Sequence, residues 1–396
     1  MKFLFFCGRE HHFQKLNDLA ELLTHKKHSV KYLLTNNSVN IDPSTEFIWR
    51  SKVPYIHAID FLTKEKLAEI DRQVNSQLPN LLKSDLLTYF APYILAHSFR
   101  EAVTNLVLFD DILNKENPDF VVVLHANNFW TKILLYLAQQ KGIKTVSFQE
   151  GMLRHRDEKT QNKQSAGMDY VDYLFVWGKN EAQSYVANEQ TKVFPVGGLH
   201  LSKYLALLNS GQYLDAKRNF VITHSLPQNY IVFAPPLISR YEGNFLESLT
   251  QLATYCYKNS LPLVLKLHPF DYASIPQLKQ LNKFGLIVWE DNFLNYELFL
   301  FSNAIVSQHS TTVIEAIAFN KPIVELDLQQ IGILESKAEQ GLAYSIKSQK
   351  DFDVLKKAFN GNVVNEQSVA QFRKENYMLF DGMALQRVAY YLEQNK

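Results

Sequence analysis

The sequence predicts the α/β class, with two similar domains in tandem, each built on a parallel sheet with crossover helices. Short runs of β-branched, aromatic and aliphatic residues alternate with longer helical stretches along the chain. These short runs are apolar almost throughout, as expected for parallel strands that are buried on both faces. The 396 residues are also enough for two domains of ordinary size, each with its own core.

The first half of the chain contains five clear strand candidates separated by helical stretches. We expect strands at 2–6, 30–34, 120–124, 145–148 and 173–177, and helices near 12–25, 80–114, 127–141 and 180–187. FPVGGLH (194–200) reads as a further short strand that enters a linker.

The second half repeats this alternation after a polar, irregular stretch. Strands are expected at 230–234, 263–267, 286–289, 304–306 and 323–326, and helices near 242–259, 312–319 and 351–359. The polar NSGQYLDAKRNF suggests the boundary. We therefore expect a first domain at 1–205, a linker at 206–228, a second domain at 229–380, and a final helix at 381–396 for which a crossing back to the first domain stays open.

Charge and composition exclude several classes of protein. Lys plus Arg (41) and Asp plus Glu (40) nearly cancel, so we expect no attraction to nucleic acid. Cys7 and Cys256 offer neither a disulfide framework nor metal-ligand spacing, which fits a reducing cytoplasm. The first apolar run is too short for a signal peptide, and no run reaches the roughly 20 apolar residues that span a bilayer. SDLLTYFAPYILAHSF (84–99) fits a core helix best, with peripheral attachment at the inner face of the plasma membrane as the alternative.

The strongest local motif is SQHSTTVIEAIAFNKPIVELD (307–327), where a strand leads into a hydroxyl-rich turn and then a helix. Ser310, Thr311 and Thr312 stand where hydroxyls and backbone N–H groups meet the positive end of the helix dipole, which suits a diphosphate. Glu315 follows within about one turn and is a candidate for the ribose hydroxyls. The alternative is an ordinary helix start with no ligand.

The second motif is LVLKLHPFD (263–271), a buried strand that ends in Lys266, His268 and Pro269. Proline fixes the turn, while His268 is expected at the crevice beyond the strand as a donor to phosphate. Lys266 has the charge for the same role. We expect this strand to be the neighbour of the strand before Ser310. A purely structural histidine is the alternative.

The third motif is KTVSFQEGMLRHRD (144–157) in the first domain. The strand delivers Gln149 and Glu150 to its carboxyl end, and Gly151 permits a tight turn. Glu150 is the predicted catalytic carboxylate, either a general base or a nucleophile. Arg154 and Arg156 are candidate cationic partners for a phosphate or a sugar carboxylate. A surface turn with a salt-bridged glutamate is the alternative. In GREHH (8–12), Arg9 is a weaker candidate for an acceptor contact.

Other motifs are missing from the sequence. There is no GxGxxG after the first strand and no GxxxxGK[ST], which argues against dinucleotide oxidoreductases and P-loop enzymes. No Asp-x-Asp stands at a strand end, and no His/Cys cluster has ligand spacing. We therefore expect a site that works without a metal.

Together, KLHP, QHSTT with Glu315, QEGMLR and FVWGK resemble bacterial glycosyltransferases of the B fold (GT-B) over roughly 118–330. Among these, the capsule and lipopolysaccharide enzymes are most similar, including the Kdo transferases, whose Glu-Asp-Gly-Phe-Leu-Arg stretch is similar to 149–154. The resemblance implies two Rossmann-like domains facing an interdomain cleft. It also implies that His268 and the turn at 310–312 hold the donor phosphate, that Glu315 holds its ribose, and that Glu150 lies near the sugar.

The same resemblance implies a metal-independent glycosyltransferase without a cofactor. A CMP-, UDP- or GDP-linked sugar is the expected donor, and a saccharide or glycolipid in surface polysaccharide synthesis is the expected acceptor, alongside other assembly enzymes. The sequence departs from the Kdo transferases at Glu150, where they have aspartate, and from many retaining relatives at Ser307, where they have glutamate.

Three alternatives stay open. One is a nucleotide-sugar 2-epimerase, for which the candidate carboxylates are Glu150, Asp271 and Glu290. The second is a transferase of polyol phosphate from a CDP-polyol, and the third is a non-catalytic sugar-binding protein.

Overall fold

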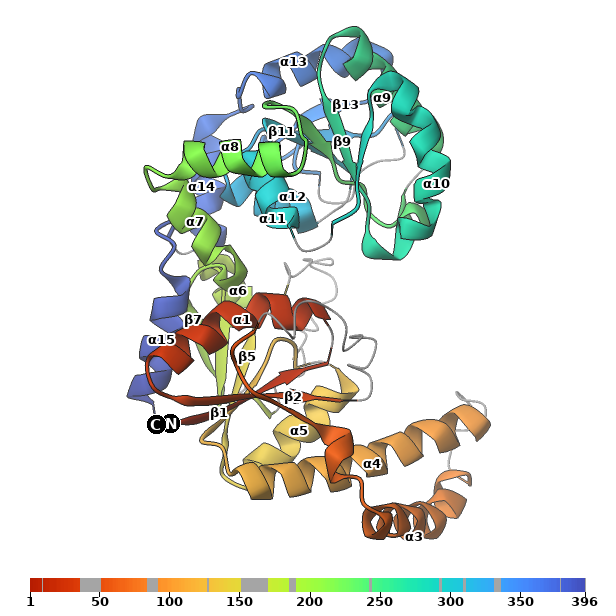
Figure 1. Cartoon of the computed structure of the whole chain (residues 1–396), viewed down its shortest axis with the longest axis vertical. Helices are drawn as coiled ribbons and strands as arrows, with labels where there is room; N and C mark the ends of the chain where they lie inside the picture. Colours follow the sequence, from red (N-terminus) through yellow and green to blue (C-terminus); the bar gives the residue numbers. More distant parts are fainter. Residues whose placement is uncertain are drawn as a thin grey trace. The chain divides into compact units, whose positions relative to one another are not determined.

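The computed structural model describes residues 1–8, 10–35, 51–83, 92–126, 128–150, 170–184, 190–241, 244–291, 294–308, 311–330, 336–377 and 379–395. The chain divides into two compact units, each with its own sheet (Figure 1). Unit 1 comprises Met1–His200 and Ala384–Lys396, and unit 2 comprises Leu201–Met383. The prediction of two parallel α/β domains is confirmed.

In the described part of unit 1, seven strands form one parallel sheet in the order β3-β2-β1-β4-β5-β6-β7. The strands are β1 (Lys2–Cys7), β2 (Ser29–Leu34), β3 (Tyr55–His57), β4 (Phe120–Val123), β5 (Lys144–Phe148), β6 (Tyr173–Val176) and β7 (Lys192–Pro195). In register, Phe5 of β1 lies opposite Tyr32 and Val122. Because the strands are parallel, their carboxyl ends and the loops that follow them share one edge of the sheet.

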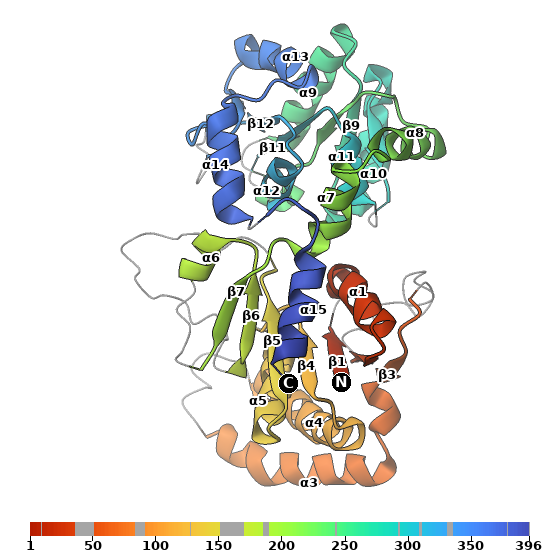
Figure 2. The ribbon, with the colours of Figure 1, turned by 90° about the vertical axis from the view of Figure 1, so that its left-hand side faces the viewer.

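Helices cover both faces of this sheet. Successive residues of β1 alternate between two cores: Phe5 faces one and Phe6 faces the other. On the Phe5 face lie α1 (Glu10–His25) and α15 (Ala384–Gln394), the last helix of the chain, which share one core and lie side by side in Figure 2. On the Phe6 face lie α4 (Pro92–Glu116) and α5 (Phe129–Gln140).

A long helix was expected at 80–114, and this prediction is wrong at its start. Instead, α3 (Lys64–Leu81) ends before a turn, and α4 begins at Pro92. Proline suits the first turn of a helix and disfavours helical backbone in the residue before it, which explains a helix start at this point. The two helices pack on each other through Ile70 and Val74 of α3 and Val103 and Val107 of α4. Residues 84–91 lie outside the described part.

The described part of unit 2 has a six-stranded parallel sheet in the order β10-β9-β8-β11-β12-β13. The strands are β8 (Ile231–Phe233), β9 (Leu263–Lys266), β10 (Ile287–Trp289), β11 (Ala304–Ser307), β12 (Ile323–Leu326) and β13 (Tyr344–Ile346). The prediction that the strands before His268 and Ser310 are neighbours is wrong. The first strand of the unit, β8, pairs with both β9 and β11 and so separates them.

The helices of unit 2 come from several parts of its sequence. They are α7 (Ser202–Leu208), α8 (Tyr213–Thr223), α9 (Phe245–Lys258), α10 (Ile275–Leu278), α11 (Asn295–Phe301), α12 (Thr311–Ala318), α13 (Val354–Phe359) and α14 (Glu366–Asn376). The capping side chain of Asn244 accepts a hydrogen bond from the backbone N–H of Glu247 at 3.1 Å, and this starts α9. The polar stretch at 206–228 contains the end of α7 and the whole of α8, within unit 2.

The two cysteines are free and buried, one in each unit. Burial raises the pKa of Cys7 and raises that of Cys256 to about 12, so both act as small apolar residues. Within the described ranges, no helix combines the length and the low polarity needed to cross a membrane.

Candidate functional site

Glu150 lies two residues beyond the end of β5, at the edge of the unit 1 sheet where the strands end. Its carboxylate Oε2 lies 3.7 Å from Nε2 of His125, which follows β4, the neighbouring strand. Its backbone oxygen accepts a hydrogen bond from the ammonium of Lys15 on α1 at 2.9 Å. Both side chains of the Glu150–His125 pair are about one-third exposed, at 30% and 38%. A carboxylate and an imidazole therefore lie within ion-pair distance of each other, both partly accessible, at one point of the sheet edge.

Gln149 points the other way, into the protein, and is 3% exposed. Its side-chain oxygen accepts a hydrogen bond from the backbone N–H of Trp177 at 2.7 Å, and its own backbone N–H donates to the oxygen of Phe175 at 2.9 Å. Gln149 also hydrogen-bonds the carboxylate of Glu181 on α6 (Lys179–Ser184). Gln149 was predicted to contact sugar or acceptor. In the structure its hydrogen bonds connect it to β6, to Trp177 after β6, and to Glu181 on α6.

A buried carboxyl group therefore lies behind the Glu150 edge. Glu181 is 3% exposed, and burial raises its pKa to about 7, opposed in part by hydrogen bonds from its own backbone and from Gln149. Its Oε2 makes no hydrogen bond within the described residues. A small pocket at the ends of β4 to β7 is lined by Lys15, Gln149, Trp177 and His200, among others. The rings of Trp177 and His200 are 5.1 Å apart.

In unit 2, the charges of Lys266 and Glu315 interact. Lys266 is the last residue of β9, and Glu315 lies on α12 with an exposed fraction of 8%. Burial lowers the pKa of Lys266 to about 8, and the nearby Glu315 carboxylate opposes this shift. Glu315 also accepts a hydrogen bond from the hydroxyl of Tyr296 on α11 at 3.2 Å. Burial and then Glu315 raise the pKa of Tyr296 well above its ordinary value, which keeps that phenol a donor.

His268 follows β9 in a half-buried position and leads into a turn of 3-10 helix, η7 (Pro269–Ser274). Its backbone oxygen accepts a hydrogen bond from the N–H of Asp271 at 2.9 Å. The Asp271 carboxylate accepts in turn from the N–H of Ile238 at 2.9 Å. Glu290 pairs with Lys279 at 2.7 Å, with both side chains more than half exposed. Of the three carboxylates considered for an epimerase, Asp271 and Glu290 are thus engaged in local structure.

The hydroxyl-rich turn is only partly described. Thr311 begins α12, so this helix starts beyond the carboxyl end of β11, on the same sheet edge as His268. Because β8 lies between, the ends of β9 and β11 are about 10 Å apart. The side chains of Pro269, Thr311 and Thr312 lie outside the description, as do Arg9, Gly151, Arg154, Arg156 and Ser310 entirely.

Four residues of these two sites were not predicted: Lys15, His125, Glu181 and Tyr296. His125 had a usable signal, because it directly follows an expected strand, and Glu150 likewise lies just beyond one. The other three lie within helices, where only the folded structure shows their neighbours. In the described part of the chain, no group of three or more His, Cys, Asp or Glu side chains could hold a metal ion.

Comparison with solved structures finds the same fold over the length of the chain. A UDP-GlcNAc 2-epimerase from Neisseria meningitidis bound to UDP-GlcNAc is 13% identical, with a TM-score of 0.66 and 100% of both chains covered. A UDP-GlcNAc 2-epimerase from Methanocaldococcus jannaschii is 14% identical, with a TM-score of 0.63 and 100% of both chains covered. The wall teichoic acid polymerase TagF is 11% identical, with a TM-score of 0.61, covering 99% of this chain and 88% of the polymerase.

No protein-family model matches the sequence, and a search of curated proteins found no match either. At these low identities the likeness to solved structures shows the fold and nothing more. This chain has the GT-B-like fold of two parallel α/β units that UDP-GlcNAc 2-epimerases and TagF share.

Proposed function

We propose that this chain is an enzyme of nucleotide-activated sugars, with the nucleotide bound at the edge of the unit 2 sheet and Glu150 as the catalytic carboxylate. The observation that carries the proposal is the edge of the unit 2 sheet. There a largely buried cationic side chain, Lys266, is within electrostatic range of the buried carboxylate Glu315, and α12 begins on the same edge. A diphosphate and a ribose need a cation, N–H donors and a hydrogen-bond acceptor, in that combination.

The roles in nucleotide binding divide as follows. His268, Lys266 and the start of α12 with Ser310, Thr311 and Thr312 hold the diphosphate, while Pro269 shapes the turn. Glu315 accepts hydrogen bonds from the ribose. Negative charge that builds up on a departing diphosphate is stabilised by these donors, which is the larger part of catalysis in such a site.

The structural neighbours favour epimerisation of the sugar over transfer of the sugar. An epimerase removes a proton from a sugar carbon and returns one to the other face, so it needs a base and an acid. Glu150 and His125, 3.7 Å apart on adjacent strand ends, can supply the proton-transfer group on one face of the sugar, and a different group must serve the other face. The solved structures include several UDP-GlcNAc 2-epimerases, and two of them contain UDP-GlcNAc.

Transfer of a sugar, or of a polyol phosphate from a CDP-polyol, to a surface polysaccharide is the second candidate. In this reaction Glu150 deprotonates the acceptor hydroxyl, and Arg9, Gly151, Arg154 and Arg156 are candidate contacts for sugar or acceptor. TagF, a polymerase of wall teichoic acid, favours it by fold. So does the engagement of Asp271 and Glu290 in local contacts, which leaves few carboxylates for an epimerase.

A first measurement tests nucleotide binding. Thermal unfolding is followed with CMP, UDP, GDP and CDP-glycerol, and a ligand at 100 times its Kd adds about 2.7 kcal/mol of stability. Glu315→Gln and His268→Ala should reduce this shift. If none of these nucleotides raises the midpoint, the proposal fails.

A second measurement separates the two reactions. The protein is incubated with UDP-GlcNAc alone and the sugar is followed by NMR: a new 2-epimer indicates epimerisation, while product that needs an added saccharide indicates transfer. Glu150→Gln should lower turnover by at least about 100-fold. Glu69→Gln, the same change on the surface of α3, is the control. An unchanged rate in Glu150→Gln would remove Glu150 from the mechanism.

A further inference from the structure

A group of polar side chains in unit 2 lies at the edge of the sheet where the strands begin, opposite the edge that carries Lys266. Lys321 stands between α12 and β12, two residues before that strand, and α8 contributes Tyr213 and Lys217. The strands of this sheet are three or four residues long, so about 10–13 Å separates the two edges. The group is therefore distinct from the proposed nucleotide site.

Tyr213, the first residue of α8, positions the ammonium of Lys321. The ammonium donates a hydrogen bond to the phenol oxygen at 3.2 Å, and the phenol donates in turn to the backbone oxygen of Leu300 at 3.0 Å. The ring of Phe301 packs on the ring of Tyr213, with 5.7 Å between their centroids. The phenol is thus held by two neighbours and uses one of the three N–H donors of Lys321.

Lys217 brings a second positive charge to the same place. It lies one helical turn after Tyr213, so both side chains leave α8 on one face. Burial, and then the charge of Lys217, lower the pKa of Lys321 to about 7, and burial also lowers the pKa of Lys217. Both side chains remain partly exposed, so an ion from solution can reach them.

No carboxylate compensates these two charges within the residues that the structure describes. In that part of the chain Lys217 makes no hydrogen bond or ion pair, and the ammonium of Lys321 bonds only to Tyr213. Two neighbouring ammonium groups that are partly withdrawn from water repel each other, and each has lost some of its hydration. An anion bound between them would offset both costs.

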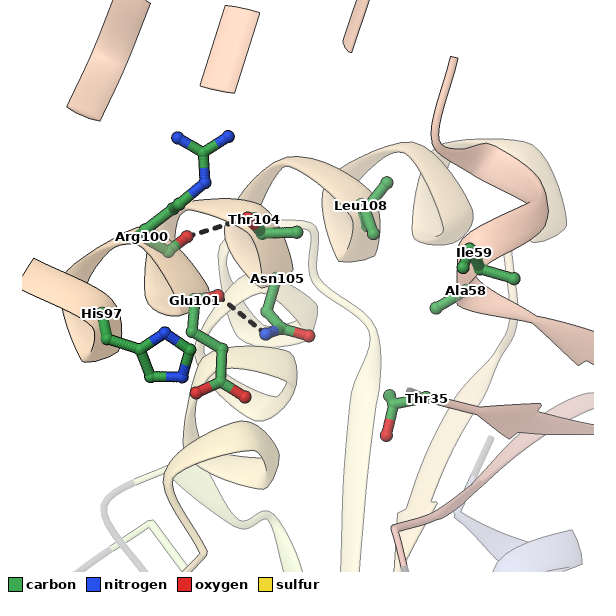
Figure 3. A pocket seen from close by; sticks show the side chains of 9 residues that line it. All are labelled: Thr35, Ala58, Ile59, His97, Arg100, Glu101, Thr104, Asn105 and Leu108. Atoms are coloured by element: carbon green, nitrogen blue, oxygen red, sulfur yellow. Dashed lines mark hydrogen bonds between the residues drawn. The ribbon is translucent and has the colours of Figure 1, made fainter. Parts of the chain in front are cut away.

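Several cations elsewhere in the chain do have carboxylate partners. Arg218, the next residue of α8, lies 3.9 Å from Asp215. Arg100 on α4, at the wall of the unit 1 pocket that Figure 3 shows, pairs with Asp71 at 2.7 Å. The missing acid is therefore a local property of the two lysines on the unit 2 edge.

The number of charges and donors selects the class of anion. Lys217 offers three N–H donors and Lys321 offers the two that Tyr213 does not use. A phosphate monoester has about −1.5 to −2 charges at pH 7 and three acceptor oxygens, which match two ammonium groups, whereas a carboxylate has one charge.

We propose that Lys217 and Lys321 bind the phosphate of a phosphate monoester at this edge of unit 2, with Tyr213 as the positioning residue. The inference does not depend on the proposed nucleotide function. Because the two edges are separate, the phosphate belongs to a second ligand, either a free phosphorylated metabolite or a lipid headgroup.

The test is a titration with methyl phosphate, followed by NMR of the added compound, with acetate as the singly charged comparison. The wild type should bind methyl phosphate at least about tenfold more tightly than acetate. Lys217→Gln and Lys321→Gln should each weaken that binding by at least about tenfold, because each removes charge-assisted hydrogen bonds. Arg218→Gln removes the same charge one position along α8 and is the matched control, with a change below about twofold.

A further variant locates the bound ion. Lys266→Gln, on the other edge, should keep its affinity for methyl phosphate. Weaker binding in Lys266→Gln with unchanged binding in Lys321→Gln would place the ion at the nucleotide edge and overturn the proposal. Equal affinities of the wild type, Lys217→Gln and Lys321→Gln, or no preference over acetate, would overturn it as well. Thermal unfolding without added ions shows that each variant is folded.

Vesicles that contain phosphatidic acid present the same group on a lipid surface. Vesicle binding that Lys321→Gln abolishes would identify the lipid as the source, while methyl phosphate binding without vesicle binding would identify a free metabolite. Stabilisation by UDP should be equal in the wild type and Lys321→Gln, since the sites are separate. A loss of UDP stabilisation confined to Lys321→Gln would contradict the assignment of Lys321 to a second site.

Discussion

Lys266 ends β9 with its ammonium largely removed from water, which lowers its pKa to about 8 despite the nearby Glu315. In the absence of ligand, keeping the Lys266 ammonium charged in this buried position costs free energy. A bound diphosphate compensates that cost, because its negative charge favours the protonated form. Binding at this site is therefore expected to take up a proton whenever the free lysine is neutral.

This linkage predicts the pH dependence of nucleotide affinity. Below pH 8 the ammonium is already charged, so affinity changes little. Above pH 8 the free protein has lost the proton, and affinity falls by about tenfold between pH 7 and pH 9. Isothermal titration calorimetry with UDP at both pH values measures this. Lys266→Gln should bind weakly and equally at the two values; a wild type with equal affinity at both would contradict the prediction.

Burial also favours the neutral form of Glu181, but in a carboxyl group this raises the pKa. Its pKa of about 7 lies above the ordinary value of 4.5, so the folded protein binds a proton that the unfolded chain releases between these values. The stabilising effect is complete below pH 4.5 and is lost as the pH rises through 7. At pH 8 the ionised side chain costs about 3 kcal/mol relative to acid conditions.

Glu181→Gln is therefore expected to gain stability relative to the wild type as the pH rises. The difference in free energy of unfolding between variant and wild type should grow by about 3 kcal/mol from pH 4.5 to pH 8, measured by urea denaturation. Glu69→Gln on the surface of α3 is the control. A difference that stays constant over this range would show that Glu181 keeps its charge when buried.

At the scale of elements, most strands that the sequence predicts are buried on both faces, and the edge strands β7 and β10 were predicted as well. FLFF in β1 and VVV in β4 are apolar runs whose every residue is buried, so pattern alone finds them. β3 (YIH) and β13 (YSI) lie at the edges of their sheets, with half-exposed or exposed residues, and were not predicted. Pairing with β2 and β12 decides that these short segments are strands, and pairing is invisible in a single sequence.

The same limit applies to the candidate sites. A motif at the end of a strand can be located from sequence, as Glu150 and His268 were. Which strand ends lie side by side depends on the winding of the sheet, and β8 enters between β9 and β11 for that reason. Partners supplied by helices, such as Lys15 and Tyr296, depend on packing and were missed.

Gly382, which precedes α15, is the position where the chain can carry no side chain. Its φ is 72°, and a Cβ there would lie 2.7 Å from the backbone nitrogen of Ala206 and 2.8 Å from the oxygen of Ser202. Gly142 has a similar φ of 69° with no atom within 4 Å of its Cβ position. Substitutions at these two glycines therefore distinguish the free-energy cost of left-handed backbone from the cost of a steric clash.

We expect Gly142→Ala to cost about 1 kcal/mol of stability, the price of left-handed backbone alone. Gly382→Ala should cost at least about 2 kcal/mol more, because α7 backbone atoms must move. Urea denaturation of both variants gives the comparison. Equal losses would mean that the chain around Gly382 adjusts freely.

For the whole molecule, the two units have separate cores, and the core of unit 1 is assembled from both ends of the chain. Val388, Ala389 and Leu392 of α15 are buried against α1 and the sheet. Each unit is therefore expected to respond to its own perturbation: a core mutation in α15 affects unit 1, and a nucleotide affects unit 2.

Leu392→Ala tests this division. Hydrogen exchange measured by mass spectrometry should show unit 1 destabilised by about 2–5 kcal/mol. Tyr390→Ala, on the same helix at 59% exposure, should change stability by less than about 0.5 kcal/mol. UDP should slow exchange in unit 2 of either variant to the same extent. Loss of protection in both units of Leu392→Ala would mean that they unfold as one.

The helix α15 completes the core of unit 1 but follows all of unit 2 in the sequence. The fold of unit 1 is therefore completed only after unit 2 has been synthesised. Residues 201–383 are made between the two parts of unit 1. At 5–20 residues per second this takes roughly 10–40 s, during which the sheet face that α15 later covers is bare on the ribosome. During this interval we expect chaperones that bind exposed apolar surface to protect this face of the sheet.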